Sequence, residues 1–227
     1  MEKFLGIFNR FGSLLLSGLG YTMFITIVAI VIGFFLGFLL AVLKIYGRGV
    51  LKWLAIAYIE LIRGTPMIVQ LFIIYYGLSQ TGLVRLTPLQ AAIIGMGLNS
   101  AAYQAEYFRS AFLAIPTGQS EAALSLGMSR AQLILNILLP QLLRIVLPSW
   151  TNELVALIQY SSIAMVVTIM ELTAVAKYIG SKTFLYMQSF IIVGIIYLAL
   201  SFIFTRLMVY FEHRLSIPGI SVTKARV

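Results

Sequence analysis

The stretch from Gln119 to Pro140 reads QSEAALSLGMSRAQLILNILLP, and it lies in a chain whose residues are 61% hydrophobic. It interrupts the apolar sequence with a carboxylate, a pair of alanines, a glycine and a proline. Its first half is rich in helix formers, with Ser120 placed to cap a helix and Glu121 placed in the first turn. Ala122 and Ala123 would let a second surface approach closely. The stretch predicts a short, exposed helix.

A turn and a second helix are expected after this short helix. Gly127 permits the positive φ of a tight turn. Ser129 is placed to begin the next helix, and Pro140 is expected to break or kink it. The short helix would then be held between two hinges.

The composition places the chain in a membrane. Only 10% of its 227 residues are charged, against roughly 25% in soluble proteins. The length fits about five or six spans of ~20 residues and leaves no room for a sizeable soluble domain. Cysteine and aspartate are both absent from the sequence. This excludes a disulfide framework, a thiolate metal site and a cysteine nucleophile, and we expect no metal site.

The net charge of +9 has a membrane explanation. The basic residues flank apolar runs and form no dense tract, which is typical of cytoplasmic anchoring rather than of nucleic-acid binding. Placing residues 109–144 in the cytoplasm leaves ten Lys and Arg on that side and five outside. This predicts a multi-pass membrane protein of five spans with its amino terminus outside and its carboxyl terminus in the cytoplasm.

Charge-free windows locate the spans, because a charge at the bilayer centre costs at least ~2.5 kcal/mol. The windows are Phe11–Leu43, Gly64–Val84, Leu86–Ala105, Leu154–Met170 and Thr183–Thr205. In the first, about Tyr21–Leu43 suffices to span, and the tail before Phe11 is expected to be an interfacial segment rather than a cleavable signal peptide.

The second span is expected to begin near Ala57, which brings two charges into its inner part. Glu60 and Arg63 are three residues apart and can pair on one helix face. We favour an interfacial ion pair before a kink at Pro66, although Glu60, Arg63 and Thr65 are also placed to gate the inner mouth.

The quoted stretch resembles the EAA loop of ATP-binding-cassette (ABC) importer permeases, whose pattern is E-A-A-x3-G-x9-I-x-L-P. The chain matches every named position at Glu121-Ala122-Ala123, Gly127 and Ile137-x-Leu139-Pro140. Three other stretches resemble permeases for polar amino acids such as histidine, glutamine, glutamate and arginine. They are Tyr58–Leu78, Ala105–Gly127 and Leu139–Val155.

This resemblance implies an all-α membrane protein with about five transmembrane helices and the type I ABC importer permease fold. It implies one permease domain over residues 1–227, with a cytoplasmic coupling loop at about 114–140. It also implies contact with a separate ATPase through six residues of that loop: Gln119, Glu121, Ala122, Ala123, Gly127 and Met128.

The resemblance implies partners as well. They are a second copy of the chain or a close paralogue, two ATPase subunits, an extracytoplasmic amino-acid-binding protein and the lipid bilayer, here that of the bacterial inner membrane. The chain lacks the G-x-x-x-x-G-K-[ST] phosphate loop, so we expect ATP and Mg²⁺ to bind the partner ATPase and no cofactor to bind here.

Polar residues within spans are candidates for substrate contact. Asn99, Tyr103 and Glu106 share one helix face, and a second group consists of Glu153, Gln159, Ser161 and Ser162. Many relatives carry a lysine before the serine-rich turn, where this chain has Gln159, so the transfer of contacts there stays open. Two carboxylates favour a basic amino acid slightly. Pairing of Glu106 with Arg109, or of Glu153 with Arg144, would instead leave a neutral site suited to glutamine.

Two other classes of membrane protein fit the sequence less well than an ABC permease. An ion-coupled secondary amino-acid carrier commonly contains inverted repeats, into which five spans do not divide. An intramembrane enzyme needs a nucleophile with a base, or metal ligands. The only histidine, His213, lies in a charged segment beyond the last span, so we expect no catalytic residue.

Overall fold

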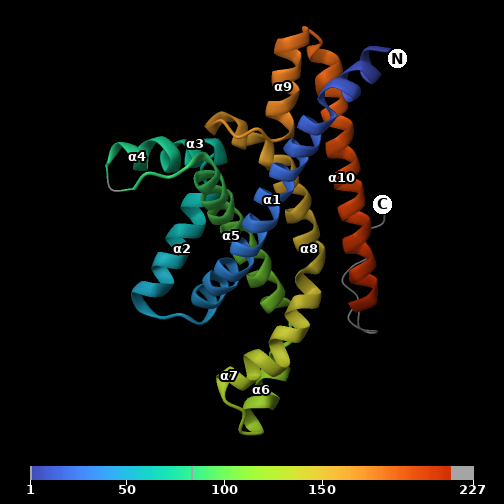
Figure 1. Cartoon of the computed structure of the whole chain (residues 1–227). Helices are drawn as coiled ribbons and strands as arrows, with labels where there is room; N and C mark the ends of the chain where they lie inside the picture. Colours follow the sequence, from blue (N-terminus) through green and yellow to red (C-terminus); the bar gives the residue numbers. More distant parts are fainter. Residues whose placement is uncertain (1, 83, 216–227) are drawn as a thin grey trace.

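The computed structural model describes residues 2–82 and 84–215, and these residues contain no β-strand. The elements are α1 (Glu2–Tyr46), α2 (Gly49–Arg63), α3 (Met67–Phe72), η1 (Ile73–Gly77), α4 (Leu78–Gln80), α5 (Pro88–Ala114), α6 (Thr117–Ser125), α7 (Arg130–Gln132), η2 (Leu133–Leu138), α8 (Leu139–Tyr160), η3 (Ser161–Val167), α9 (Leu172–Thr183) and α10 (Tyr186–Leu215). In Figure 1, α9 and the start of α1 lie at one end, here called the α9 end, and α6 and α7 lie at the opposite α6 end.

Three helical stretches of the described chain are long and apolar enough to cross a membrane: α1, Arg130–Val167 and α10. The bent pair of α2 with α3–α4 makes a fourth if it is counted as one span. Helix α5 has 27 residues and packs along α1 and α8, so its polar residues face protein rather than lipid. The all-α membrane architecture with about five transmembrane helices is confirmed.

Helix α1 is one continuous helix of 45 residues. The expected separation of an interfacial tail from a span beginning near Tyr21 was wrong. The tail continues the helix because Ile7 and Leu15 are buried against α9 and α10. At 1.5 Å per residue the helix is roughly 68 Å long, so it extends well beyond a ~30 Å hydrocarbon core.

The second predicted span is sharply bent. The chain bends by 108° between α2 and α3–α4, so the expected kink at Pro66 is confirmed. Ala57, the expected start of the span, lies inside α2, which begins at Gly49. Proline lacks the N–H that would continue α2 and favours an extended preceding residue. We call residues 64–66 the elbow.

The fourth predicted span begins earlier than expected. A π-helical turn, η2, leads directly into α8, and Pro140 lies in the first turn of α8. Because the wider π turn precedes the proline, the helix continues through it, and the expected break at Pro140 was wrong. Beyond α8 the chain tightens into η3, which ends at Thr168 with φ 70°.

The last span and the segment before it form a helical hairpin. The predicted span Thr183–Thr205 corresponds to the longer α10, whereas α9 was not predicted. Glu171 begins α9 by accepting the backbone N–H groups of Thr173 and Ala174, and it also accepts the hydroxyl of Tyr197 on α10. The segment 216–227, expected on the cytoplasmic side, lies outside the described residues.

Small residues allow α1 and α5 to approach closely. A Cβ atom added to Gly33 would collide with the Gln104 side chain and lie 2.7 Å from the Ser100 hydroxyl oxygen. A Cβ atom on Gly20, in the same helix, would meet nothing within 4 Å. The packing of α5 on α1 therefore depends on Gly33.

We predict opposite effects of the same substitution at these two glycines. Gly33→Ala should lower the free energy of unfolding by about 1–3 kcal/mol because it overpacks a polar contact. Gly20→Ala should be neutral or stabilising by up to about 1 kcal/mol, since alanine favours the helix. Thermal unfolding of both variants in detergent tests this, and equal midpoints would contradict the packing assignment.

Candidate functional site

A buried carboxyl group joins α5 to α8. Glu153 on α8 is 6% exposed, and its two oxygens accept hydrogen bonds from the Ser100 hydroxyl (2.7 Å) and the Tyr107 hydroxyl (3.3 Å) on α5. Glu153 takes part in none of the ion pairs of the described residues. The alternative pairing with Arg144 is therefore not observed.

The hydrogen bonds continue from Ser100 towards α1. The Gln104 amide nitrogen donates to the Ser100 hydroxyl (3.0 Å) and to the backbone carbonyl of Ile30 (3.2 Å). The Gln104 amide oxygen accepts from the Trp150 indole N–H at 2.7 Å. Three helices are thus joined at mid-length through polar groups that lipid cannot satisfy.

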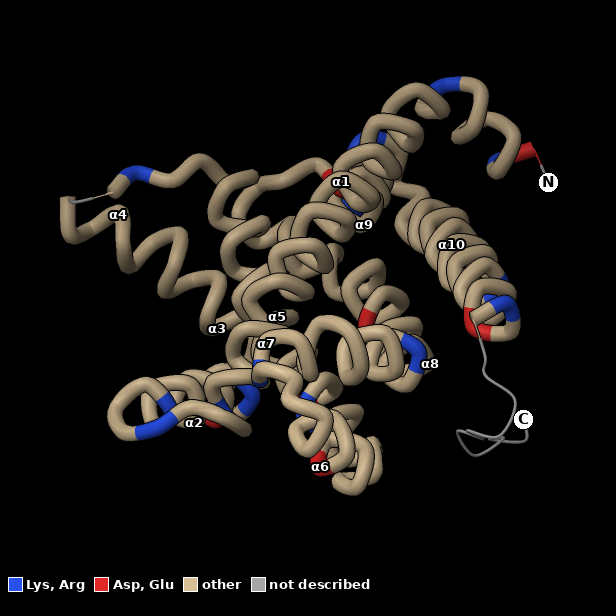
Figure 2. The backbone as a smooth tube through the Cα atoms, turned by 90° about the horizontal axis from the view of Figure 1, so that it is seen from below, with Lys and Arg blue, Asp and Glu red and all other residues tan. Residues whose placement is uncertain are grey.

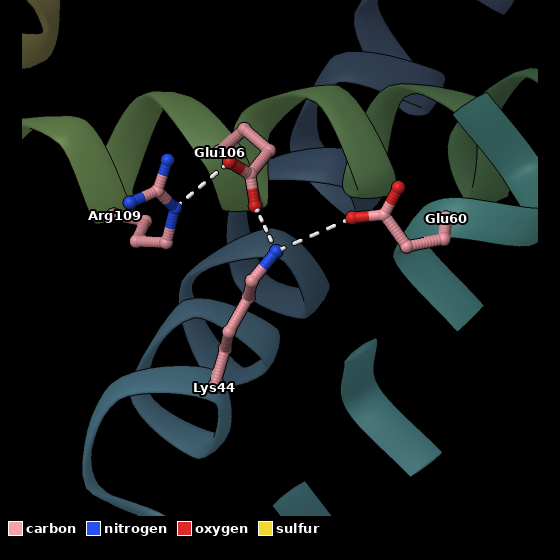
Figure 3. Close-up of polar contacts among 4 residues, drawn as sticks. All are labelled: Lys44, Glu60, Glu106 and Arg109. Atoms are coloured by element: carbon pink, nitrogen blue, oxygen red, sulfur yellow. Dashed lines mark hydrogen bonds and ion pairs between the residues drawn. The ribbon is translucent and has the colours of Figure 1, made fainter. Parts of the chain in front are cut away.

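Glu106, the second predicted carboxylate, lies in a charged cluster. Its oxygens lie 2.6 Å from the Lys44 Nζ and 2.8 Å from the Arg109 Nε, and Lys44 Nζ also lies 3.6 Å from Glu60 (Figure 3). The pair with Arg109, left open by the sequence, is confirmed. The expected pair between Glu60 and Arg63 was wrong, because Glu60 points to Lys44 on α1.

Asn99 fastens the elbow to α5. Its amide donates to the Gln70 amide oxygen at 2.9 Å. The Gln70 amide nitrogen donates to the Ile62 carbonyl (2.7 Å) and the Thr65 carbonyl (3.0 Å), which satisfies carbonyls left open where α2 ends. Both side chains are buried. In this conformation the Asn99 amide donates to Gln70 within the protein rather than to a substrate.

The remaining residues predicted to contact substrate lie in two places, on α5 and where α8 meets η3. Tyr103 lies on α5 under the Arg63 guanidinium, whose central carbon is 5.4 Å from the ring centroid. Ser161 is buried and donates to the Ile158 carbonyl, while Ser162 donates to the Gln159 carbonyl. The Gln159 side chain is exposed. The structure therefore joins Glu153 to α5 and leaves the residues around Gln159 separate.

A cavity of about 500 Å³ lies where η3 meets α9, lined by residues that include Met165, Lys177, Tyr178 and Tyr186. None of the predicted substrate residues lines it.

The predicted coupling helix is α6. It begins at Thr117 after Pro116, so Ser120 and Glu121 lie inside it, and the expected cap at Ser120 was wrong. Pro116 is the N-cap residue of α6, and no side-chain cap hydrogen bond is formed there.

The predicted turn at Gly127 is confirmed. Gly127 has φ 81°, its N–H bonds to the Leu124 carbonyl and the Met128 N–H bonds to the Ala123 carbonyl. This pair of bonds is a Schellman motif, which ends helices at a left-handed residue. Ser129 caps α7 as expected, in a capping box with Gln132.

The side chains of α6 divide into an anchored set and an exposed set. Ala123 is buried against η2 and α8, and Gln119 accepts a 2.7 Å hydrogen bond from Gln141 on α8. Glu121 and Ala122 are exposed, and Leu126 is 83% exposed. Helices α6 and α7 project from the α6 end of the bundle (Figure 1), and α6 carries an acidic residue (Figure 2).

Sequence reasoning missed several residues of these networks, among them Lys44, Gln70, Ser100, Gln104 and Glu171. The available signal was a polar side chain within a charge-free window, or a charge at its edge. Nothing in the pattern, however, indicates which two helices such side chains join.

The sequence matches, over residues 29–217, the family described as binding-protein-dependent transport system inner membrane component. The chain belongs to this family. The probable amino-acid ABC transporter permease YckA of Bacillus subtilis (strain 168) is 42% identical over 185 residues, covering 82% of this chain and 81% of that protein.

Two further comparisons agree with this membership. The arginine transport system permease ArtQ of Bacillus subtilis (strain 168) is 37% identical over 191 residues, covering 84% of this chain and 87% of that one. A crystal structure of an amino acid ABC transporter with histidines superposes with a TM-score of 0.84 at 36% identity, covering 93% and 98% of the two chains. The chain is a membrane translocation component of the amino-acid ABC permease type.

We predict that Glu106 serves the structure rather than substrate choice. Glu106→Gln removes the negative charge shared by Lys44 and Arg109, leaves Lys44 only Glu60 at 3.6 Å as a charged partner, and should lower the free energy of unfolding by about 1–3 kcal/mol. It should depress uptake of all amino acids equally. The double variant Lys44→Met/Glu106→Leu should lose less stability than the sum of the single variants. A strictly additive loss, or selective loss of basic substrates, would contradict this assignment.

Proposed function

We propose that this chain forms the translocation pathway of an ATP-driven importer for polar amino acids, with basic ones slightly favoured. The observation that carries the proposal is α6, a helix that projects from the α6 end with exposed Glu121 and Leu126 and a fixed turn at Gly127. An exposed leucine beside a carboxylate and alanines is suited to a protein groove.

The proposed occupant of α6 is a separate ATPase subunit that binds ATP and Mg²⁺. Gln119, through its bond to Gln141, and buried Ala123 fasten α6 to α8. Ala122 and Gly127 are exposed, Met128 is half-buried beside Ala123, and all three are proposed ATPase contacts. Because α8 also holds Glu153 against α5, movement of α6 would be transmitted to the centre of the pathway. ATP and substrate would then favour different conformations.

The proposed assembly contains two copies of this chain, or one copy and a close paralogue, with two ATPase subunits. An extracytoplasmic binding protein would deliver the amino acid. Closed twofold symmetry is the commonest solution for such assemblies. In this assembly residues 1–227 form one permease domain, with a coupling loop at about 114–140, the α6 end in the cytoplasm and the amino terminus outside.

The preference for basic substrates rests on Glu153. A buried carboxylate without a cationic partner can accept charge-assisted hydrogen bonds from an ammonium or guanidinium group. Relatives are named for arginine and for a complex with histidines, which supports a basic substrate here. Asn99, Tyr103, Gln159, Ser161 and Ser162 remain proposed contacts for the amino-acid backbone. Asn99 would first have to release Gln70.

ATP-driven uptake is the test of the proposed function. Proteoliposomes with this chain, its ATPase and its binding protein should accumulate arginine or glutamine when ATP is inside and no ion gradient exists. Uptake driven by a sodium or proton gradient without ATP would instead establish the ion-coupled carrier.

A valine at Gly127 should weaken binding of the ATPase. A β-branched residue at φ 81° is strained by about 1–2 kcal/mol, which should distort α6 and reduce affinity for the ATPase roughly tenfold. Gly82→Val is the matched control, since Gly82 has φ 71° and lies beyond α4, away from α6. Equal loss of ATPase binding in both variants would assign the effect to general destabilisation.

Glu153→Gln should reduce selectivity. Replacing the carboxylate removes the charge but keeps hydrogen-bonding groups for Ser100 and Tyr107, so the helices should stay joined. Uptake of arginine or lysine should fall about tenfold more than uptake of glutamine. Uptake rates from mixtures of labelled amino acids measure this ratio, and an unchanged ratio would remove Glu153 from the substrate site.

A further inference from the structure

Arg63 ends α2 in an unusual environment. Its guanidinium lies over the Tyr103 ring, 5.4 Å from the centroid, and its side chain is exposed. Arg63 belongs to none of the three ion pairs in the described part of the chain. The nearest acidic residue in sequence, Glu60, is held by Lys44 instead.

The elbow holds Arg63 beside the middle of α5. Helix α2 spans Gly49–Arg63, so Arg63 lies roughly 21 Å along the helix axis from Gly49, a distance shorter than the ~30 Å thickness of a hydrocarbon core. Tyr58 donates to the Leu98 carbonyl and Gln70 accepts from Asn99, which fixes α2 and α3 beside the middle of α5 (Figure 1).

An arginine in a candidate membrane span that forms no ion pair in the described residues indicates a functional site. Stacking on Tyr103 holds the plane of the guanidinium while its edge N–H groups stay available. Those N–H groups form a fork that matches a carboxylate.

The residues beyond Tyr103 complete the arrangement. Tyr107 lies one helical turn after Tyr103, interacts electrostatically with both Tyr103 and Arg63, and donates its hydroxyl to Glu153. Two tyrosines on one face of α5 thus lie between a free guanidinium and a buried carboxyl group. A zwitterionic amino acid carries a carboxylate that complements the guanidinium and an ammonium group that complements the carboxyl group.

We propose that Arg63 binds the α-carboxylate of the transported amino acid, with Tyr103 as the residue that positions it. Glu153 would then bind the ammonium or basic side chain at the opposite end. The inference rests on the proposed function, since it names which part of the substrate that site recognises. Every α-amino acid carries the carboxylate, so Arg63 sets the substrate class and Glu153 sets the preference within it.

The test compares an amino acid with its decarboxylated analogue. Binding of radiolabelled arginine and agmatine is measured on the complex of this chain with its ATPase in nanodiscs, without the binding protein. Ligand-induced thermal stabilisation extends the range to millimolar affinities. Arg63→Gln should weaken arginine roughly 10- to 100-fold and change agmatine less than about threefold. Arg63→Lys, which keeps the charge but loses the fork, should give a smaller loss for arginine.

Arg206→Gln is the matched control, because Arg206 also stacks on an aromatic ring, that of Phe202 on α10, at 4.9 Å. It should leave both ligands unchanged. Equal losses of arginine and agmatine in Arg63→Gln, no loss of arginine, or wild-type agmatine binding as tight as arginine would each overturn the inference.

The inference and the proposed function fail in different ways. A wild-type complex that imports arginine with ATP but shows no saturable arginine binding overturns the site at Arg63 and leaves the importer intact. Failure of ATP-driven uptake by the wild type overturns the proposed function itself.

Discussion

The structure depends on satisfying the polar side chains of α5 without water. Lipid offers no hydrogen-bond partners, so every buried amide and hydroxyl of this helix must find protein. Ser100, Gln104 and Asn99 do so by reaching α8, α1 and α3 respectively. These bonds fix α5 as the centre around which the other helices pack, and Gly33 lets α1 come close enough to take part.

The same requirement explains the elbow. A helix that ends inside the membrane leaves open carbonyls, and Gln70 satisfies two of them from the following turn. Asn99 then holds Gln70, so the bend at Pro66 is stable only while α5 lies beside it. The second span can therefore break because the third span supplies hydrogen-bond partners at the break, and the bend places Arg63 beside Tyr103 on α5.

Local chemistry made part of this predictable from sequence. Charge-free windows gave the spans approximately, and the left-handed turn at Gly127 and the cap at Ser129 followed from residue type. The EAA spacing gave the family. The pairing of Glu106 with Arg109 was open and is resolved, because residues three apart on a helix meet without help from the fold.

What could not be predicted depends on contacts between distant helices. Glu60 and Arg63 satisfy the same spacing rule as Glu106 and Arg109, yet they separate, since Lys44 on α1 reaches Glu60 and Tyr103 lies under Arg63. Pro140 has the local signature of a break, but the π turn before it absorbs the misfit. The tail before Tyr21 stays helical because α9 and α10, which come far later in the sequence, bury it.

These long-range contacts also determine how the two ends of the molecule can communicate. Helix α6 is fastened to α8 through Ala123 and Gln119, and α8 is fastened to α5 through Glu153. Helix α5 holds the elbow through Asn99. A shift of α6 would therefore reach Glu153 through α8. It would reach Arg63 through α8 and then α5, which holds the elbow. Glu153 on α8 and Arg63 on α2 flank the same pair of tyrosines on α5, so a small relative movement of α8 and α2 would change the distance between the two charges. In the proposed importer an amino acid of fixed size would respond to that distance, so coupling and recognition would depend on the same three helices.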